Sequence, residues 1–146
     1  MQASVIELPF NSFLGIQIAT EKTQLLRLPS GEQYLNHLGT VHASAQLALA
    51  EASSGEFLLR YFSSAADVLP VVRRIEAKFR KPANGTLTST AAVPQETLDR
   101  LNADLTAKGR GLVPVNVDVR DESGAHVLSA VVEWFIQRVS PTDRIA

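Results

Sequence analysis

The sequence contains no cysteine, which excludes disulfide frameworks, cysteine-ligated zinc, iron–sulfur clusters and thiol nucleophiles. Histidine is scarce as well: with only His37, His42 and His126, few side chains could ligate a metal ion. The 8 glycines and 7 prolines follow no period, so collagen-like and fibrous classes are excluded. There is no HExxH, no Gly-rich phosphate loop and no GxSxG element. We therefore expect neither a metal centre nor a serine triad.

Long hydrophobic runs are also missing. Even the stretch 127–136 carries polar interruptions and is far shorter than the ~20 residues that cross a bilayer. The first residues, MQASVIE, lack the basic and apolar regions of a secretory signal. With 45% hydrophobic residues in 146, the chain has enough apolar material for one core. We expect a single domain over residues 1–146, cytoplasmic and without a membrane partner.

The formal net charge of −1 argues against nucleic-acid binding, but the charge is unevenly spread. Residues 60–81 contain six basic and two acidic side chains, a net charge of +4. This segment is interpreted either as a solvated strand face or as a binding strip for a small polyanion. Its basic residues are Arg60, Arg73, Arg74, Lys78, Arg80 and Lys81.

Hydrophobic periodicity and turn residues predict an α+β fold with an antiparallel sheet. Strands are expected at 15–19, 24–28, 56–62, 71–80, 86–93, 112–120 and around 128–136. One helix is expected over 41–54, with Thr40 as N-cap and Gly55 just beyond its end. A second, amphipathic helix is expected from Pro94 to Gly109.

The helix predicted over 41–54 is rich in alanine and serine and has no clean polar face, which is typical of a buried helix with a sheet curled around it. Glu51 is its only acid, and a buried carboxylate must be paired or functional. His42 lies at its start, beside backbone N–H groups able to hold an oxyanion. Structural roles stay open for both: Glu51 satisfied by an arginine or the backbone, and His42 as an ordinary residue of the helix start.

The stretch from Asn36 to Glu51 resembles the hotdog-fold acyl-CoA thioesterases, especially the phenylacetate-pathway and 4-hydroxybenzoyl-CoA type. In that pattern an Asn in a loop precedes His-Gly-Gly at the start of the central helix, and an Asp or Glu follows nine residues after the His. Asn36, His42 and Glu51 have the same spacings of six and nine, whereas Ala43-Ser44 replaces Gly-Gly. The resemblance implies a hotdog fold, a curved antiparallel sheet wrapped around a long central helix.

The same resemblance implies hydrolysis of an acyl-CoA to the free acid and CoA, with no cofactor beyond the CoA of the substrate. Glu51 would act as general base or nucleophile, and the Ala43 N–H as oxyanion donor. Asn36 and His42 would position water or the carbonyl. The basic side chains expected to meet the CoA phosphates are Arg73, which is in phase with the inward Ile75, and Arg74, Lys78, Arg80 and Lys81.

Helix geometry adds an expectation about assembly. The nine positions from His42 to Glu51 rotate by roughly 900°, a net half turn, and rise by roughly 13.5 Å. Glu51 and the oxyanion donor at the helix start therefore face opposite sides of one helix. If both act on one carbonyl, the site is shared between two subunits. We expect a homodimer or a dimer of dimers, as in the family.

Two other functions are compatible with the same fold. A hotdog dehydratase or hydratase is one, although the His-Phe-Pro-Gly or similar His/Asp element of those enzymes is missing. A non-catalytic protein that binds or senses acyl-CoA is the other, and the replacement of Gly-Gly by Ala43-Ser44 keeps it open.

Overall fold

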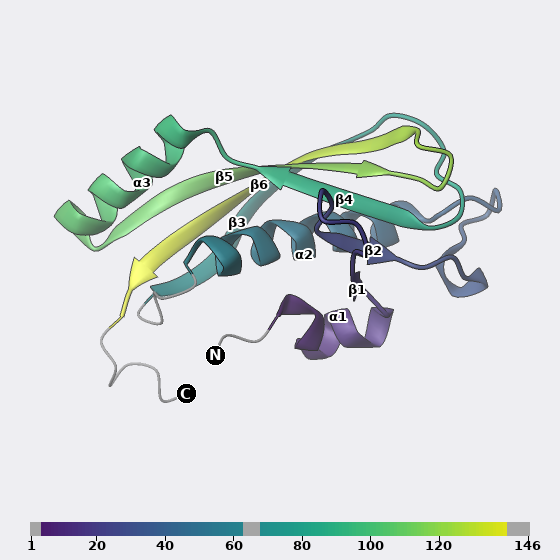
Figure 1. Ribbon diagram of the computed structural model, residues 1–146, viewed down its shortest axis with the longest axis horizontal. Coiled ribbons are helices and arrows are strands. Elements are labelled where there is room, and N and C mark those ends of the chain that lie inside the picture. The colour runs from purple at the N-terminus through teal and green to yellow at the C-terminus, as the bar shows by residue number, and fades with distance from the viewer. Residues whose placement is uncertain (1–3, 63–67, 140–146) are drawn as a thin grey trace.

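The computed structural model describes residues 4–62 and 68–139. Two long helices and a six-stranded sheet dominate the fold (Figure 1). The elements in chain order are η1 (Val5–Glu7), α1 (Pro9–Leu14), β1 (Gln17–Ile18), β2 (Leu26–Leu28), η2 (Glu32–Tyr34), α2 (Ala43–Tyr61), β3 (Val68–Phe79), β4 (Leu87–Ala92), α3 (Gln95–Lys108), β5 (Arg110–Arg120) and β6 (His126–Arg138).

The six strands form one antiparallel sheet in the order β1-β2-β4-β5-β6-β3. Since β2 and β3 lie near opposite edges, the chain that connects them crosses the whole sheet, and α2 is the element that makes the crossing (Figure 1). Along most of its length α2 is buried against the sheet. The expected α+β fold, with a curved antiparallel sheet around a central helix, is confirmed.

The central helix is longer than its sequence suggested. Gly55 lies in the middle of α2, and a Cβ at that position would be 3.4 Å from Val5 and 3.5 Å from Trp134. These are ordinary van der Waals distances, so Gly55 is simply an interior residue of α2 and does not end the helix. The strand expected over 56–62 was wrong, because these residues continue α2 as far as Tyr61. As a result Glu51 is not the only acid of the buried helix, since Glu56 is also within it.

The second half of the chain follows its alternating sequence closely. Pro94 precedes α3, and Gly109 ends it in the left-handed conformation with φ 74°. Leu98, Leu101 and Leu105 are buried where α3 packs on β5. The alternating valines of β5 and apolar residues of β6 face the core as expected: Val113, Val115, Val117, Val119, Leu128, Ala130, Val132, Trp134 and Ile136.

Strand β3 forms an edge of the sheet, hydrogen-bonded to β6 on one side only. All of its side chains are exposed or half-buried, including the large apolar side chains of Leu69, Val71, Ile75 and Phe79. A β-bulge between Val72 and Arg74 shifts the register of the strand. The alternation expected through residues 71–80 is therefore interrupted within the strand.

The short helix α1 was not among the elements predicted from the sequence. Glu56 of α2 binds the residues that precede α1. Its Oε1 accepts hydrogen bonds from Ser4 Oγ at 2.8 Å and Val5 N at 3.1 Å. Glu56 Oε2 accepts a third hydrogen bond from Arg60 Nε at 2.9 Å. Three donors thus satisfy the second buried acid of α2, which is typical of a structural carboxylate.

Candidate active site

The start of α2 leaves one backbone N–H free. His42 is the N-cap, in place of the expected Thr40, and its Nδ1 accepts a hydrogen bond from Ser44 N at 2.9 Å. The carbonyl of His42 accepts from Ala45 N at 3.0 Å and Gln46 N at 3.1 Å. The Ala43 N–H has no acceptor among the described residues and is exposed at the positive end of the helix. It is the first-turn donor available to a ligand.

Asn36 organises the loop in front of this helix. Its Oδ1 accepts hydrogen bonds from Leu38 N at 2.9 Å and Thr40 N at 3.1 Å, and its Nδ2 donates to Thr40 Oγ1 at 2.9 Å. The side chain thus shapes the turn that leads to His42, and Thr40 is a partner of this turn. His42 uses Nδ1 to cap the helix, so a neutral ring carries its proton on Nε2.

Glu51 lies half-buried near the middle of α2. Its carboxylate has no hydrogen bond and no ion pair with any described residue, in contrast to Glu56. Burial raises the pKa of the Glu51 carboxyl above its usual value. Ser54 Oγ donates to the Glu51 carbonyl at 2.6 Å and accepts from Trp134 Nε1 at 2.9 Å, which ties this turn of α2 to β6. An unpaired carboxylate with a raised pKa is suited to accept a proton.

A pocket of about 310 Å³ opens at the start of α2, and we call it the helix-start pocket. Its lining combines apolar, basic and amide side chains: Asn36, Leu38, Thr40, Val41, Ala43, Gln46, Phe79, Arg80, Lys81 and Pro82. Leu38 and Phe79 are 73% and 47% exposed, so the apolar part of its wall is open to a ligand. Glu51 is not part of this lining. The pocket therefore joins Ala43 and Asn36, and leaves the carboxylate of the same chain outside.

The five basic residues expected to bind phosphate lie in different parts of the structure. Arg80 and Lys81 line the helix-start pocket beside Ala43. Arg74 is paired with Glu76. Arg73 was expected in phase with the inward Ile75, but the β-bulge alters its orientation: its side chain is 62% exposed, and its Nε lies 4.0 Å from Glu133 Oε1.

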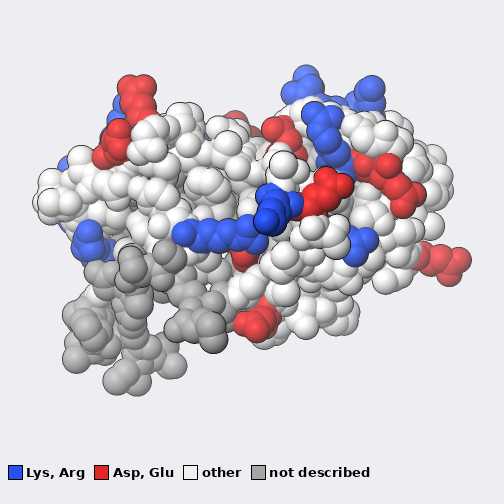
Figure 2. Space-filling view, viewed as in Figure 1, with Lys and Arg blue, Asp and Glu red and all other residues white. Residues whose placement is uncertain are grey.

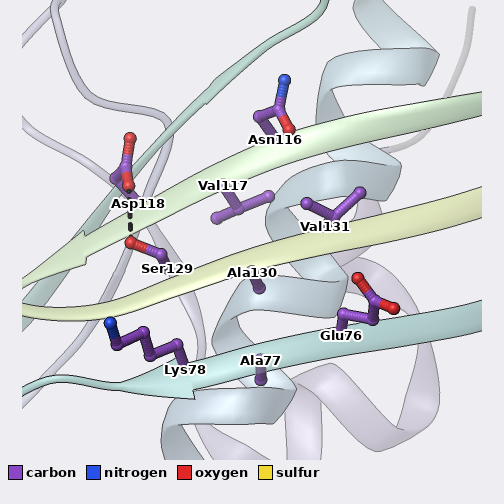
Figure 3. A pocket seen from close by; sticks show the side chains of 9 residues that line it. All are labelled: Glu76, Ala77, Lys78, Asn116, Val117, Asp118, Ser129, Ala130 and Val131. Carbon is purple, nitrogen blue, oxygen red and sulfur yellow. Dashed lines mark hydrogen bonds between the residues drawn. The ribbon is translucent and has the colours of Figure 1, made fainter.

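Lys78 lies on the sheet face opposite α2, where a second pocket of about 330 Å³ spans β3, β5 and β6 (Figure 3). Beside it, His126 Nε2 lies 2.8 Å from Asp118 Oδ1 and 3.1 Å from Ser129 Oγ. These three residue types are those of a serine triad, but a triad uses the two different ring nitrogens of its histidine. Here both partners contact the same nitrogen, so the cluster is not a triad.

The charged side chains on the face shown in Figure 2 do not form a continuous basic surface, since acidic side chains lie beside the basic ones. Over residues 4–62 and 68–139 there is no group of three or more histidine and acidic side chains arranged to hold a metal ion. Within the same residues, no helix has both the length and the hydropathy needed to span a membrane.

The chain belongs to the family described as a domain of unknown function, DUF4442, whose sequence model matches residues 5–136. No curated protein matches the sequence. The match therefore shows which family the chain belongs to, but it does not indicate an activity.

Solved structures of other proteins define the fold as the hotdog fold of the thioesterase superfamily. A Pseudomonas aeruginosa protein of unknown function, described as a probable thioesterase, is 26% identical, covers 92% of this chain and 91% of its own, and has a TM-score of 0.77. A Haemophilus influenzae thioesterase is 19% identical over 92% and 87% of the two chains, with a TM-score of 0.68. A Bacillus halodurans protein crystallised with CoA is 20% identical over 76% and 69%, with a TM-score of 0.60.

Sequence reasoning missed Gln46, which lines the helix-start pocket and is only 4% exposed. Its Nε2 donates to the Val41 carbonyl at 3.0 Å, while its Oε1 is buried without a partner among the described residues. The sequence did contain a signal for it, because a glutamine among the small side chains of a buried helix needs hydrogen-bond partners, as Glu51 does.

Proposed function

We propose that this protein is an acyl-CoA thioesterase that hydrolyses a CoA thioester to a free acid and CoA. The observation that carries the proposal is the free Ala43 N–H at the mouth of the helix-start pocket, on the same helix as the unpaired Glu51. The coarser class, a hotdog thioester hydrolase or CoA-binding protein, is supported by relatives described as thioesterases and by one crystallised with CoA.

In the proposed reaction the thioester carbonyl oxygen accepts a hydrogen bond from the Ala43 N–H, which stabilises the negative charge that develops on that oxygen. Glu51 removes a proton from the attacking water, or attacks the carbonyl itself. The C–O bond forms, the C–S bond breaks, and the proton passes to the departing CoA sulfur. Asn36 and His42 hold the loop and the helix start in place through the hydrogen bonds described above.

The proposed site is completed by a second subunit, whose Glu51 faces the helix-start pocket of the first. Two observations support this assembly. Glu51 does not line the pocket of its own chain. The exposed edge of β3 offers an unpaired row of backbone groups and the apolar side chains of Leu69, Val71 and Ile75 to a second copy. Two-fold symmetry then produces two equivalent sites.

The phosphates of CoA are assigned to the basic residues next to the pocket. Arg80 and Lys81 line it, whereas Lys78 lies on the opposite face of the sheet. Cations at the mouth of an apolar pocket suit a substrate with an acyl chain at one end and phosphates at the other.

A non-catalytic acyl-CoA-binding protein is the second candidate. The thioesterase pattern that the sequence resembles has glycine at the position of Ala43, whose methyl group would narrow the slot for a thioester beside the free N–H. A thiol-release assay with a panel of acyl-CoAs distinguishes the two functions. Release of CoA that depends on Glu51 supports hydrolysis, whereas CoA binding measured by calorimetry without any turnover supports the binding protein.

A further inference from the structure

Strand β3 presents a regular backbone edge along its second half. Arg80 N donates to the Val127 carbonyl at 2.8 Å, and residues 74–79 pair with β6 in one unbroken antiparallel register. Backbone groups alternate in direction along a strand, so every second residue from position 75 onward directs its N–H and C=O away from β6. These residues are Ile75, Ala77 and Phe79. Their backbone groups form the open edge of the sheet.

The first half of β3 is not suited to further pairing. Arg138 N donates to the Gly109 carbonyl at 2.8 Å, so the same alternation directs the backbone of Ile136 toward β5. Pro70 lies opposite Ile136, and its nitrogen therefore faces the open edge, where it has no hydrogen to donate. The β-bulge then breaks the alternation. A strand added at this edge is thus confined to the half that follows the bulge.

The charges of this half are arranged symmetrically about Ala77. Positions 75 to 79 read Ile-Glu-Ala-Lys-Phe, with apolar residues at both ends and opposite charges inside. Glu76 and Lys78 flank Ala77 along β3, on the face of the sheet opposite α2 (Figure 3). Glu76 is ion-paired with Arg74, whereas no hydrogen bond or ion pair joins Lys78 to another described residue. The Lys78 ammonium is thus free to pair with an acid of another chain.

A second copy of this strand, antiparallel and related by a two-fold axis at Ala77, has the matching charges. Glu76 then lies opposite the partner's Lys78, and Lys78 opposite the partner's Glu76, in the kind of pair whose side chains are closest. A shift of one residue places Glu76 opposite itself or Lys78 opposite itself, and a shift of two runs into the bulge or past the end of the strand. Arg74 lies opposite the partner's Arg80 at the ends of the pairing, where its own Glu76 already neutralises it. The charge pattern therefore favours the register centred on Ala77.

The same register joins two exposed apolar side chains on the face toward α2. Ile75 and Phe79 pair with Val132 and Leu128 of β6, which are buried in the core, so both project to that face. They remain 37% and 47% exposed in one chain. In the two-fold arrangement each lies opposite the other, with Cα atoms about 5.5 Å apart. Since Phe79 lines the helix-start pocket, the partner's Ile75 lies beside that pocket.

We propose that β3 pairs with the β3 of a second copy in the register centred on Ala77. The partner's Ile75 then packs against Phe79 and completes the apolar wall of the helix-start pocket. This inference rests on the proposed function, which requires a second subunit at the same pocket. The acyl end of the substrate is enclosed by residues of both chains.

Introduced cysteines test the register, because the sequence contains none of its own. The full-length variants Ile75→Cys and Phe79→Cys are mixed under reducing conditions and then oxidised gently. Their thiols lie opposite each other in the proposed register, with Cα atoms within the range of a disulfide. A covalent mixed dimer, identified by its mass, should form in high yield. Either variant oxidised alone is the control, because each cysteine is then several residues out of register with its own copy.

Ala77→Cys is a second variant, with a smaller change of side chain. Position 77 faces itself across the two-fold axis, so this variant should form a covalent homodimer. A register shifted by one residue separates the two Cα atoms by about 7–8 Å, beyond the usual reach of a disulfide.

Charge reversal tests the same register without a covalent bond. Glu76→Lys or Lys78→Glu alone places like charges opposite each other in both central pairs, so each should weaken the dimer by about tenfold in sedimentation measurements. A mixture of the two variants restores opposite charges in both pairs. Mixed dimers should therefore form in preference to either homodimer.

The inference is overturned if the Ile75→Cys and Phe79→Cys chains form no more covalent dimer together than alone, or if the charge variants show no preference for mixed dimers. Thermal unfolding first establishes that each variant is folded, and Ala77→Cys replaces a cysteine pair that is not. Failure of the register leaves thioester hydrolysis intact, because these measurements do not depend on turnover. The hydrolase function fails separately, when the wild-type protein releases no CoA from any acyl-CoA tested.

Discussion

Ala43 and Glu51 lie on one continuous helix, eight residues and about 12 Å apart along its axis. Ala43 lines the helix-start pocket and Glu51 does not. The two residues are rigidly fixed relative to each other, since α2 is packed against the sheet along most of its length. A helix that carries a free backbone N–H at one end and an unpaired carboxylate further along it suits the proposed pair of symmetric, shared sites.

The first prediction concerns the Glu51 carboxylate. Glu51→Gln keeps the size of the side chain and removes the base, so turnover of acyl-CoA should fall at least ~100-fold while CoA binding is retained. Turnover is measured by thiol release and binding by calorimetry. Glu21→Gln, at an exposed position, is the control. Near-normal turnover in a folded Glu51→Gln variant contradicts the assignment.

The second prediction concerns the pH dependence of activity. A base must be ionised to accept a proton, and burial raises the pKa of Glu51. kcat/KM should therefore fall on the acid side with an apparent pKa above the 4.5 of an ordinary glutamate. The residual activity of Glu51→Gln should lack this acid limb. A wild-type profile that is flat down to the usual glutamate range argues against Glu51 as the base.

The third prediction is that the raised pKa of Glu51 lowers the free energy of unfolding at neutral pH. A carboxyl with a raised pKa in the folded state contributes stability below its unfolded pKa, and that contribution is lost as the pH rises through the folded value. At neutral pH the ionised, half-buried Glu51 thus destabilises the fold. Glu51→Gln should raise the free energy of unfolding at pH 7, and the gain should shrink as the pH falls through the raised pKa of the folded state and vanish below about 4.5. Urea unfolding at both pH values measures it, and a variant less stable at pH 7 points to a structural Glu51.

The fourth prediction concerns the basic residues of the pocket mouth. Arg80→Glu or Lys81→Glu should raise KM for CoA esters more than it lowers kcat, and the effect should shrink with added salt. Esters of pantetheine lack the nucleotide phosphates, so their KM should not respond to these variants. Thr90→Ala, an exposed change on β4, is the control. If the wild type has equal KM values for the two kinds of ester, these cations form only a solvated surface.

The sequence predicted most of the sheet because its strands alternate strictly. Val113 to Val119 place every second side chain in the core, and the structure has them there. The pattern of Asn36, His42 and Glu51 likewise located the central helix and the loop before it. The structural relatives have the fold that this resemblance implied.

Packing decided the features that the sequence did not predict. A glycine commonly follows the end of a helix, yet Gly55 lies inside α2, where it is buried near Val5 and Trp134 from distant parts of the chain. The bulge that turns Arg73 toward Glu133 depends on the pairing of β3 with β6. The free oxygen of Gln46 follows from a hydrogen bond to Val41 that spacing alone does not specify.

The shared site is the central claim, and mixed dimers test it most directly. One chain carries Glu51→Gln and the other carries a bulky replacement at the helix start, Ala43→Phe, so that each homodimer has a defect in both of its sites. In a mixed dimer both defects fall in one site, and the other site combines an intact Glu51 with an intact Ala43. Co-refolded mixtures should recover up to about a quarter of wild-type activity, because random pairing makes half of the dimers mixed and each has one good site of two. Absence of recovery, with mixed dimers confirmed by mass, would contradict a site made from Ala43 of one subunit and Glu51 of the other.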